Sequence, residues 1–149
     1  MNKIYPKKLR EIIESLQMTA DPSDRAQMLI DYAYKFEEVP VSVAQRPFSE
    51  RNKIPACESD AYIWAIDNQD NTLKFFFAVE NPSGISAKAL AVILDKTLSG
   101  LHSEEIIQIE PDIVYDIFRQ NISMGKGLGL MSMVHAVKKL AEQHLKKNK

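Results

Sequence analysis

The chain has 149 residues, of which 45% are hydrophobic and 26% are charged, a balance typical of a globular domain in water. Its formal net charge of −1 gives no electrostatic reason to expect nucleic acid or an anionic membrane as a partner. No apolar run approaches membrane-spanning length and no signal-peptide pattern follows the start, so we expect one cytoplasmic domain over residues 1–149.

Two helices are predicted before residue 40. Apolar residues at positions 9, 12, 13 and 16 follow the spacing of one helix face, which predicts a helix over residues 6–18. Asp21 and Pro22 form a good N-cap and first position for a second helix that reaches about Glu37. Residues 38–54 then lose all periodicity, which is typical of a functional loop or a disordered segment.

A β-hairpin is predicted after this irregular segment. Residues 61–66 and 73–79 are rich in β-branched and aromatic side chains, and the polar cluster between them is typical of a turn. A short strand near residues 51–54 would add a third member to the sheet. One face of the first strand carries large apolar side chains, and we expect that face to pack on helices. These side chains belong to Tyr62, Trp64 and Ile66.

The C-terminal half is predicted to be mainly helical. A helix should follow the turn signal of residues 81–84 and end at Ser99-Gly100. A short helical turn begins at Ser103, and Pro111 starts another helix that reaches about Phe118. Together the elements predict an α+β fold, in which several α-helices pack on one face of a small antiparallel sheet of about three strands.

The segment Gly125-Lys126-Gly127-Leu128-Gly129 does not match a phosphate-binding loop. Gln120 stands where that motif needs a glycine, and a glycine stands where it needs Ser or Thr. No strand is predicted before it, so it does not match a dinucleotide fingerprint either. We interpret the glycines as a tight turn with close backbone approach, and we expect the last helix to start after them.

The histidines show no metal-ligand spacing among themselves or with the cysteine, so we expect no metal site. His135 lies between apolar positions of the last helix. That position favours a structural histidine whose hydrogen bonds are satisfied inside the protein.

Cys57 is the only cysteine, which excludes an intramolecular disulfide and every Cys-x-x-Cys motif. Such a thiol is either a small buried core residue or a reactive group, and composition does not decide between them. A proline before it and polar residues after it favour an exposed turn ahead of a strand. The acidic neighbours Glu58 and Asp60 oppose formation of a thiolate. A reactive Cys57 would need a compensating donor or cation, for which Arg51 and Lys53 are candidates.

Around this cysteine the chain resembles the SufE family, the sulfur-accepting partners of cysteine desulfurases in iron–sulfur cluster assembly. The family pattern runs roughly Asn-x-Ile-x-Gly-Cys-x-Ser, and further matches lie upstream and in the last helix, in the right order. The matching residues are Asn52, Ile54, Cys57 and Ser59, with Arg25, Leu29 and Ile30 upstream and Gly127, Leu128 and Met131 downstream.

Several positions depart from the family pattern, so the chain is similar to a divergent member. Ala56 replaces a glycine and Tyr62 replaces a tryptophan. Asn81-Pro82-Ser83 replaces a Ser-Asp-Ala run, and Met124 replaces an arginine. If those groups tune the thiol or its partner, the departures alter the rate or the choice of partner.

The resemblance implies a SufE/IscU-like fold and a sulfur-transfer role for Cys57. The thiol would take persulfide sulfur from a cysteine desulfurase and pass it to an iron–sulfur scaffold complex. The desulfurase would hold the pyridoxal phosphate, so this chain would need no cofactor. The chain would be a monomer or a weak homodimer. Its partner-binding residues would be Arg51, Pro55, Ala56, Glu58, Ser59 and Lys126.

Two other classes of function stay open at this point. The first is a non-catalytic module that stimulates or blocks a desulfurase by docking alone. The second is a cysteine-dependent hydrolase or a one-cysteine peroxidase, for which no local sequence signature is present.

Overall fold

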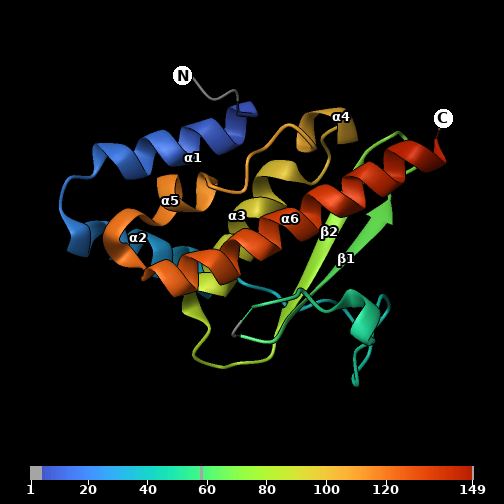
Figure 1. Ribbon diagram of the computed structural model, residues 1–149, viewed down its shortest axis with the longest axis horizontal. Coiled ribbons are helices and arrows are strands. Elements are labelled where there is room, and N and C mark those ends of the chain that lie inside the picture. Colours follow the sequence, from blue (N-terminus) through green and yellow to red (C-terminus); the bar gives the residue numbers. More distant parts are fainter. Residues whose placement is uncertain (1–4, 58, 149) are drawn as a thin grey trace.

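Helix α3 (Ile85–Leu98) lies at the centre of the fold, and nine of its residues are buried. A helix that is apolar on nearly all sides needs neighbours on all sides. Accordingly, α3 contacts α1 (Lys7–Met18), α2 (Pro22–Tyr34) and α6 (Met124–Lys147), as well as the sheet (Figure 1). The computed structural model describes residues 5–57 and 59–148.

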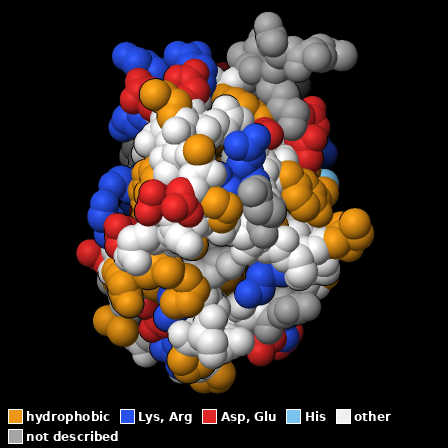
Figure 2. Space-filling view, turned by 90° about the vertical axis from the view of Figure 1, so that its left-hand side faces the viewer, with side chains coloured by type: hydrophobic (Ala, Val, Ile, Leu, Met, Phe, Trp, Pro, Cys, Tyr) orange, Lys and Arg blue, Asp and Glu red, His pale blue; other side chains and the backbone are white. Residues whose placement is uncertain are grey.

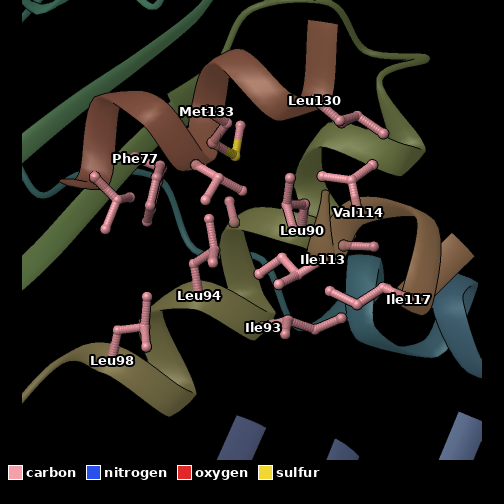
Figure 3. Packing of buried hydrophobic residues seen from close by; sticks show 14 of the residues in the cluster. Phe77, Leu90, Ile93, Leu94, Leu98, Ile113, Val114, Ile117, Leu130 and Met133 are labelled. Carbon is pink, nitrogen blue, oxygen red and sulfur yellow. The ribbon is translucent and has the colours of Figure 1, made fainter. Parts of the chain in front are cut away.

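The apolar core forms where α3 meets α5 (Ile113–Phe118), α6 and the sheet. Figure 3 shows side chains from these elements converging on one cluster, with Leu90 and Leu94 of α3 among them. Both leucines are fully buried, as is Met133 of α6. Burial of side chains of this size contributes about 1.5–3 kcal/mol each, so this cluster supplies much of the stabilisation of the fold.

The sheet is an antiparallel hairpin of β1 (Ala61–Asp67) and β2 (Leu73–Val79). Among the described residues, the expected third strand is reduced to a single bridge between Lys53 and Tyr62. Pairing cannot continue on either side of Lys53. The 3-10 turn η1 (Glu50–Asn52) ends just before it, and Pro55 has no N–H to donate. The α+β class is confirmed, with helices on one face of the hairpin.

The face of β1 that packs on helices is the opposite of the one expected. Tyr62 and Trp64 lie on the outer face, half-buried, and Ile66 is exposed. Phe48 covers that outer face, with its ring centroid 5.2 Å from that of Tyr62 and 5.0 Å from that of Trp64. The expectation was wrong because both faces of the hairpin are apolar. The alternation of side chains along a strand does not tell which of two apolar faces packs on helices. The buried face carries Ala61, Ile63, Phe75 and Phe77.

Residues 35–60 wrap around the hairpin from one edge to the other. The Val39 N–H donates to the Phe77 carbonyl at the edge of β2, at 2.9 Å. Phe48 then crosses the outer face, and the Asn52 side chain donates to the Ile63 carbonyl at the edge of β1, at 3.0 Å. The irregular segment is therefore bonded along its length to the hairpin whose first strand follows the cysteine.

The last helix begins before its glycines, not after them. Ser123 caps α6, since its Oγ accepts the Lys126 N–H at 3.2 Å. Gly127 lets Tyr115 pack closely on α6, because a Cβ there would lie 2.7 Å from the hydroxyl of Tyr115. Glycine disfavours a helix by about 1 kcal/mol, and here the cap and the packing outweigh that cost.

Other boundaries differ from the prediction by two or three residues. Helix α2 ends at Tyr34, and α5 begins at Ile113. The short helical turn α4 (Ser103–Ile106) lies where it was expected. Helix ends commonly shift by this amount, because the last turns are held by few hydrogen bonds.

The buried histidine of the last helix is His144, not His135, which is exposed. The Nδ1 atom of His144 lies 2.8 Å from the Ser103 hydroxyl at the start of α4. The expectation for His135 was wrong because this residue lies with Lys139, one turn later, on the solvent-exposed side of α6.

Substitution of two nearby glycines should separate helix propensity from packing. We expect Gly125→Ala, which meets nothing within 4 Å, to raise the free energy of unfolding by about 0.5–1 kcal/mol. We expect Gly127→Ala to lower it by about 1–3 kcal/mol, because the Tyr115 ring must move. Urea denaturation of both variants measures the two values. Equal stabilisation by both alanines would contradict the assigned Tyr115 contact.

Candidate functional site

Cys57 lies in the turn between the Lys53 bridge and β1, half-buried at the edge of the apolar core. Its side chain lines a hollow of about 220 Å³, here called the Cys57 hollow. The walls come from the cysteine turn, from the loop before α3 with the first turn of that helix, and from the first turns of α6. Residues of these walls include Ser59, Asn81, Ser83, Ser86, Gly129 and Lys126.

The base of the cysteine turn is closed by one backbone hydrogen bond and one ion pair. The Ile54 N–H donates to the Ala61 carbonyl at 2.8 Å. Lys53 Nζ lies 3.5 Å from Asp60 Oδ1, and this carboxylate together with Glu50 raises the pKa of Lys53 above its ordinary value. Both side chains of the pair are substantially exposed, so the pair adds little to stability.

Two residues of the turn adopt left-handed backbone conformations. The φ angle is 60° at Ala56 and 49° at Asp60, on either side of the cysteine. This region disfavours residues with a side chain by about 1 kcal/mol, and glycine carries no such penalty. Ala56 stands where the family pattern has glycine, so the departure falls at a backbone position that glycine suits better.

The cysteine turn is bonded to the loop that leads into α3. The Asn81 N–H donates to the Ser59 carbonyl and the Glu80 N–H to the Asp60 carbonyl, each at 3.2 Å. Gly84 makes this approach possible, because a Cβ there would lie 2.8 Å from Ser59 Oγ. Figure 1 shows this loop beside the cysteine turn, near the starts of α3 and α6.

An ionic cluster ties the irregular segment to the same loop. The Arg46 guanidinium donates to the carboxylates of Glu38 and Glu80, and Glu80 directly precedes the wall residue Asn81. The hydrogen bond from Arg46 holds the pKa of Glu38 below its ordinary value. The cluster is exposed, so it positions the loop more than it stabilises the domain.

The electrostatic surroundings of the hollow favour an anion. Helices α3 and α6 both begin at its wall, and their N-terminal turns carry partial positive charge. Lys126 adds a full positive charge, and none of the described lining residues is acidic. Helix N-termini and nearby lysines are the surroundings in which cysteine thiolates form. The hollow can therefore support a nucleophilic Cys57.

The profile of the SufE family, described as an Fe-S metabolism associated domain, matches residues 10–141. The chain belongs to the SufE family. It is 26% identical to SufE-like protein 1, chloroplastic/mitochondrial, of Arabidopsis thaliana over 137 residues, which are 91% of this chain and 35% of that protein. It is 29% identical to an uncharacterized SufE-like protein of Synechocystis over 113 residues, 76% of this chain and 66% of that protein.

This SufE-family chain thus spans about a third of the length of the first relative and 66% of the second. The fold is shared with the solution structure of a hypothetical protein from Thermus thermophilus, with a TM-score of 0.75 and 21% identity. That superposition covers 96% of this chain and 99% of the other. It confirms the SufE-like α+β fold.

The structure divides the predicted site residues of this SufE-family protein into two groups. Ser59 and Lys126 line the Cys57 hollow together with the cysteine. Arg51 and Pro55 line a second hollow on another side of the same segment. Ala56 is exposed beside the cysteine, and Glu58 lies outside the described residues.

The wall formed by residues 81–86 was not predicted from the sequence. Asn81, Ser83, Gly84 and Ser86 reach the hollow from the loop and helix start that follow β2, whose end pairs with the start of β1. The one signal that pointed there was the departure of residues 81–83 from the family pattern. No set of three or more His, Cys, Asp and Glu side chains is placed to hold a metal, and no helix is long and apolar enough to cross a bilayer, within residues 5–57 and 59–148.

Replacement of Ala56 by glycine should relax the turn. We expect Ala56→Gly to leave the free energy of unfolding unchanged or raise it by up to about 1 kcal/mol, because the left-handed conformation then carries no penalty. The control Ala44→Gly, in the same irregular segment and outside that conformation, should lower it by about 0.4–1 kcal/mol. Thermal unfolding of both variants measures the contrast, and equal losses would refute the assigned backbone geometry.

Removal of the positive charge at the hollow should lower the rate at which the Cys57 thiol reacts. We expect Lys126→Gln to reduce the rate of Cys57 alkylation by iodoacetamide about two- to fivefold near neutral pH, because less thiolate is present. Lys147→Gln, on the same helix and away from the hollow, is the matched control and should react like the wild type. Identical rates for all three proteins would show that Lys126 does not act on the sulfur.

Proposed function

We propose that Cys57 accepts the sulfane sulfur of a persulfide carried by a cysteine desulfurase and passes it to an iron–sulfur cluster scaffold. The observation that carries the proposal is a half-buried thiol in a hollow lined by Lys126 and two helix starts. Membership of a family associated with Fe–S metabolism supports the same chemistry.

The transfer is a thiol exchange that needs no outside oxidant or reductant. The Cys57 thiolate attacks the terminal sulfur of the desulfurase persulfide. A new S–S bond forms on Cys57 while the S–S bond of the desulfurase breaks, and the desulfurase cysteine leaves as a thiolate. This single-cysteine chain has no second thiol that could expel the sulfur by closing an intramolecular disulfide.

The hollow is suited to shelter the persulfide between the two exchanges. Its wall carries the hydroxyls of Ser59, Ser83 and Ser86, which are able to donate hydrogen bonds to an anionic sulfur. Alanine and leucine side chains complete the lining and limit the access of water. The half-buried turn must shift outward for the exchange itself, as loop segments commonly do when they meet a partner.

Apolar side chains beside the hollow support docking of a partner protein. On α6, Met124 and Leu128 are 79% and 58% exposed, and Ile85 and Tyr115 are also exposed. Figure 2 looks onto the end of the molecule at which α6 begins, where hydrophobic side chains lie exposed among basic and acidic ones. Exposed apolar side chains gathered around a site are typical of protein interfaces. We place the exchange in the cytoplasm, where a lone thiol stays reduced.

A second candidate is a module that regulates the desulfurase by docking without carrying sulfur. Asn81 lines the hollow and Met124 lies at the start of α6 beside it, and both depart from the family pattern. The departures therefore lie next to Cys57 and on the surface that a partner would contact. A change there could remove sulfur transfer and leave docking intact.

Labelled cysteine and a desulfurase distinguish the two candidates. We expect wild-type protein to acquire one labelled sulfur and Cys57→Ser to acquire none, because serine forms no persulfide. Lys147→Gln, which keeps the thiol and lies away from the hollow, is the control and should still be labelled. The measurement is intact-protein mass spectrometry with label counting. If Cys57→Ser retains full stimulation of the desulfurase and the wild type carries no label, the docking module is the correct function.

A further inference from the structure

A larger hollow lies on the other side of the segment that carries Cys57. It measures about 620 Å³ and is here called the basic groove. One wall is the segment from Arg51 to Pro55, the floor includes Ile63 of β1, and the other wall is a stripe of α6. The stripe consists of Ser132, His135, Ala136, Lys139, Leu140 and Gln143.

The groove is lined by basic and by aliphatic side chains. Arg51, Lys53 and Lys139 line it together with His135, and none of its described lining residues is acidic. Because Lys53 pairs with Asp60, the positive charge offered to an occupant comes mainly from Arg51 and Lys139, in a chain whose net charge is −1. A surface of this kind is complementary to carboxylates that surround an apolar side chain.

The shape of the groove determines how an occupant can lie in it. The α6 stripe runs over eleven residue steps, which correspond to about 16 Å along the helix axis. The adjoining part of the β1 edge is blocked, because the Asn52 side chain already donates to the Ile63 carbonyl. The occupant therefore lies along α6 and contacts it through side chains, without adding a strand to the sheet.

We propose that the basic groove docks an acidic segment, with apolar side chains between its carboxylates, on the surface of the desulfurase. This inference rests on the proposed function and adds a binding site to it. Pro55 lies in the groove, and Cys57 follows it by two residues in the adjacent hollow. A segment held in the groove thus places its own protein directly beside the thiol.

Nucleic acid fits the groove less well than an acidic protein segment. The described lining residues include no Phe, Tyr or Trp on which a base could stack. The apolar lining residues are Pro55, Ile63, Ala136 and Leu140, whose side chains offer no hydrogen bonds to bases.

Charge reversal in the groove tests the docking site. The double variant R51E/K139E is compared with the wild type and with K146E, which changes an exposed lysine of α6 outside the groove. Binding of a desulfurase that loads Cys57 is measured by fluorescence anisotropy in a Cys57→Ser background, so that no sulfur is exchanged. We expect the double variant to bind about tenfold more weakly and with a smaller salt dependence, and K146E to bind like the wild type.

A second measurement separates docking from chemistry. With Cys57 present, the rate at which R51E/K139E acquires labelled sulfur should fall at low desulfurase concentration and recover at saturating concentration. Iodoacetamide alkylation of Cys57 should be unchanged, which shows that the turn is intact. K139Q, which removes one charge and keeps a polar side chain of similar length, should give an intermediate affinity.

Each other outcome is decisive. If the wild type is loaded but R51E/K139E binds as tightly as K146E, the groove proposal is overturned and the proposed function stands. If no desulfurase loads the wild type, the proposed function fails, and the groove proposal fails with it. Displacement of the desulfurase from the wild type by a single-stranded oligonucleotide, at equal ionic strength, would overturn the proposal in favour of nucleic acid.

Discussion

The backbone hydrogen bonds that hold residues 53–60 between β1 and the loop before α3 determine where the thiol lies. The Ile54 N–H bonds to Ala61 on one side, and the Asn81 N–H bonds to Ser59 on the other. Each such bond contributes only about 0.5–1.5 kcal/mol net, so the turn can open at a cost well below that of unfolding the domain. Cys57 is positioned by the backbone bonds of its neighbours and by its packing at the edge of the core.

The electrostatic surroundings of the Cys57 sulfur depend on which residues line the hollow. The residues next to Cys57 in sequence are a poor guide to that lining. Asp60 is adjacent in sequence, yet its carboxylate pairs with Lys53 at the base of the turn and does not line the hollow. Lys126, sixty-nine positions from the cysteine, does line it. The cation that lines the hollow with Cys57 is therefore Lys126 of the last helix, while Arg51 and Lys53 line the other hollow.

Local sequence signals predicted most helices and strands. Tertiary packing decided which faces are buried and where α6 begins. The hairpin and α3 were predictable because turn residues bound them and their apolar patterns are strong. The packed face of β1 was not, because Phe48 covers the outer face from a segment without periodicity. The start of α6 was misplaced because the Tyr115 contact that requires Gly127 involves a distant residue. For the same reason, the sequence pointed to Ser59 and Lys126 beside Cys57 through the family pattern, while the wall of residues 81–86 was not predicted.

The departures from the family pattern fall both in the Cys57 hollow, at Asn81 and Ser83, and at the turn and surface beside it, at Ala56 and Met124. Ala56 occupies a left-handed position where a side chain costs about 1 kcal/mol, so the closed turn is held less firmly than it would be with glycine. Met124 turns the surface beside the hollow from basic to apolar, while Arg51 and Lys139 keep positive charge in the groove on the other side. Under the proposed function, two docking surfaces of different chemistry flank one turn. A partner that engages both spans the turn between them, and its contacts can offset the modest cost of moving the turn outward.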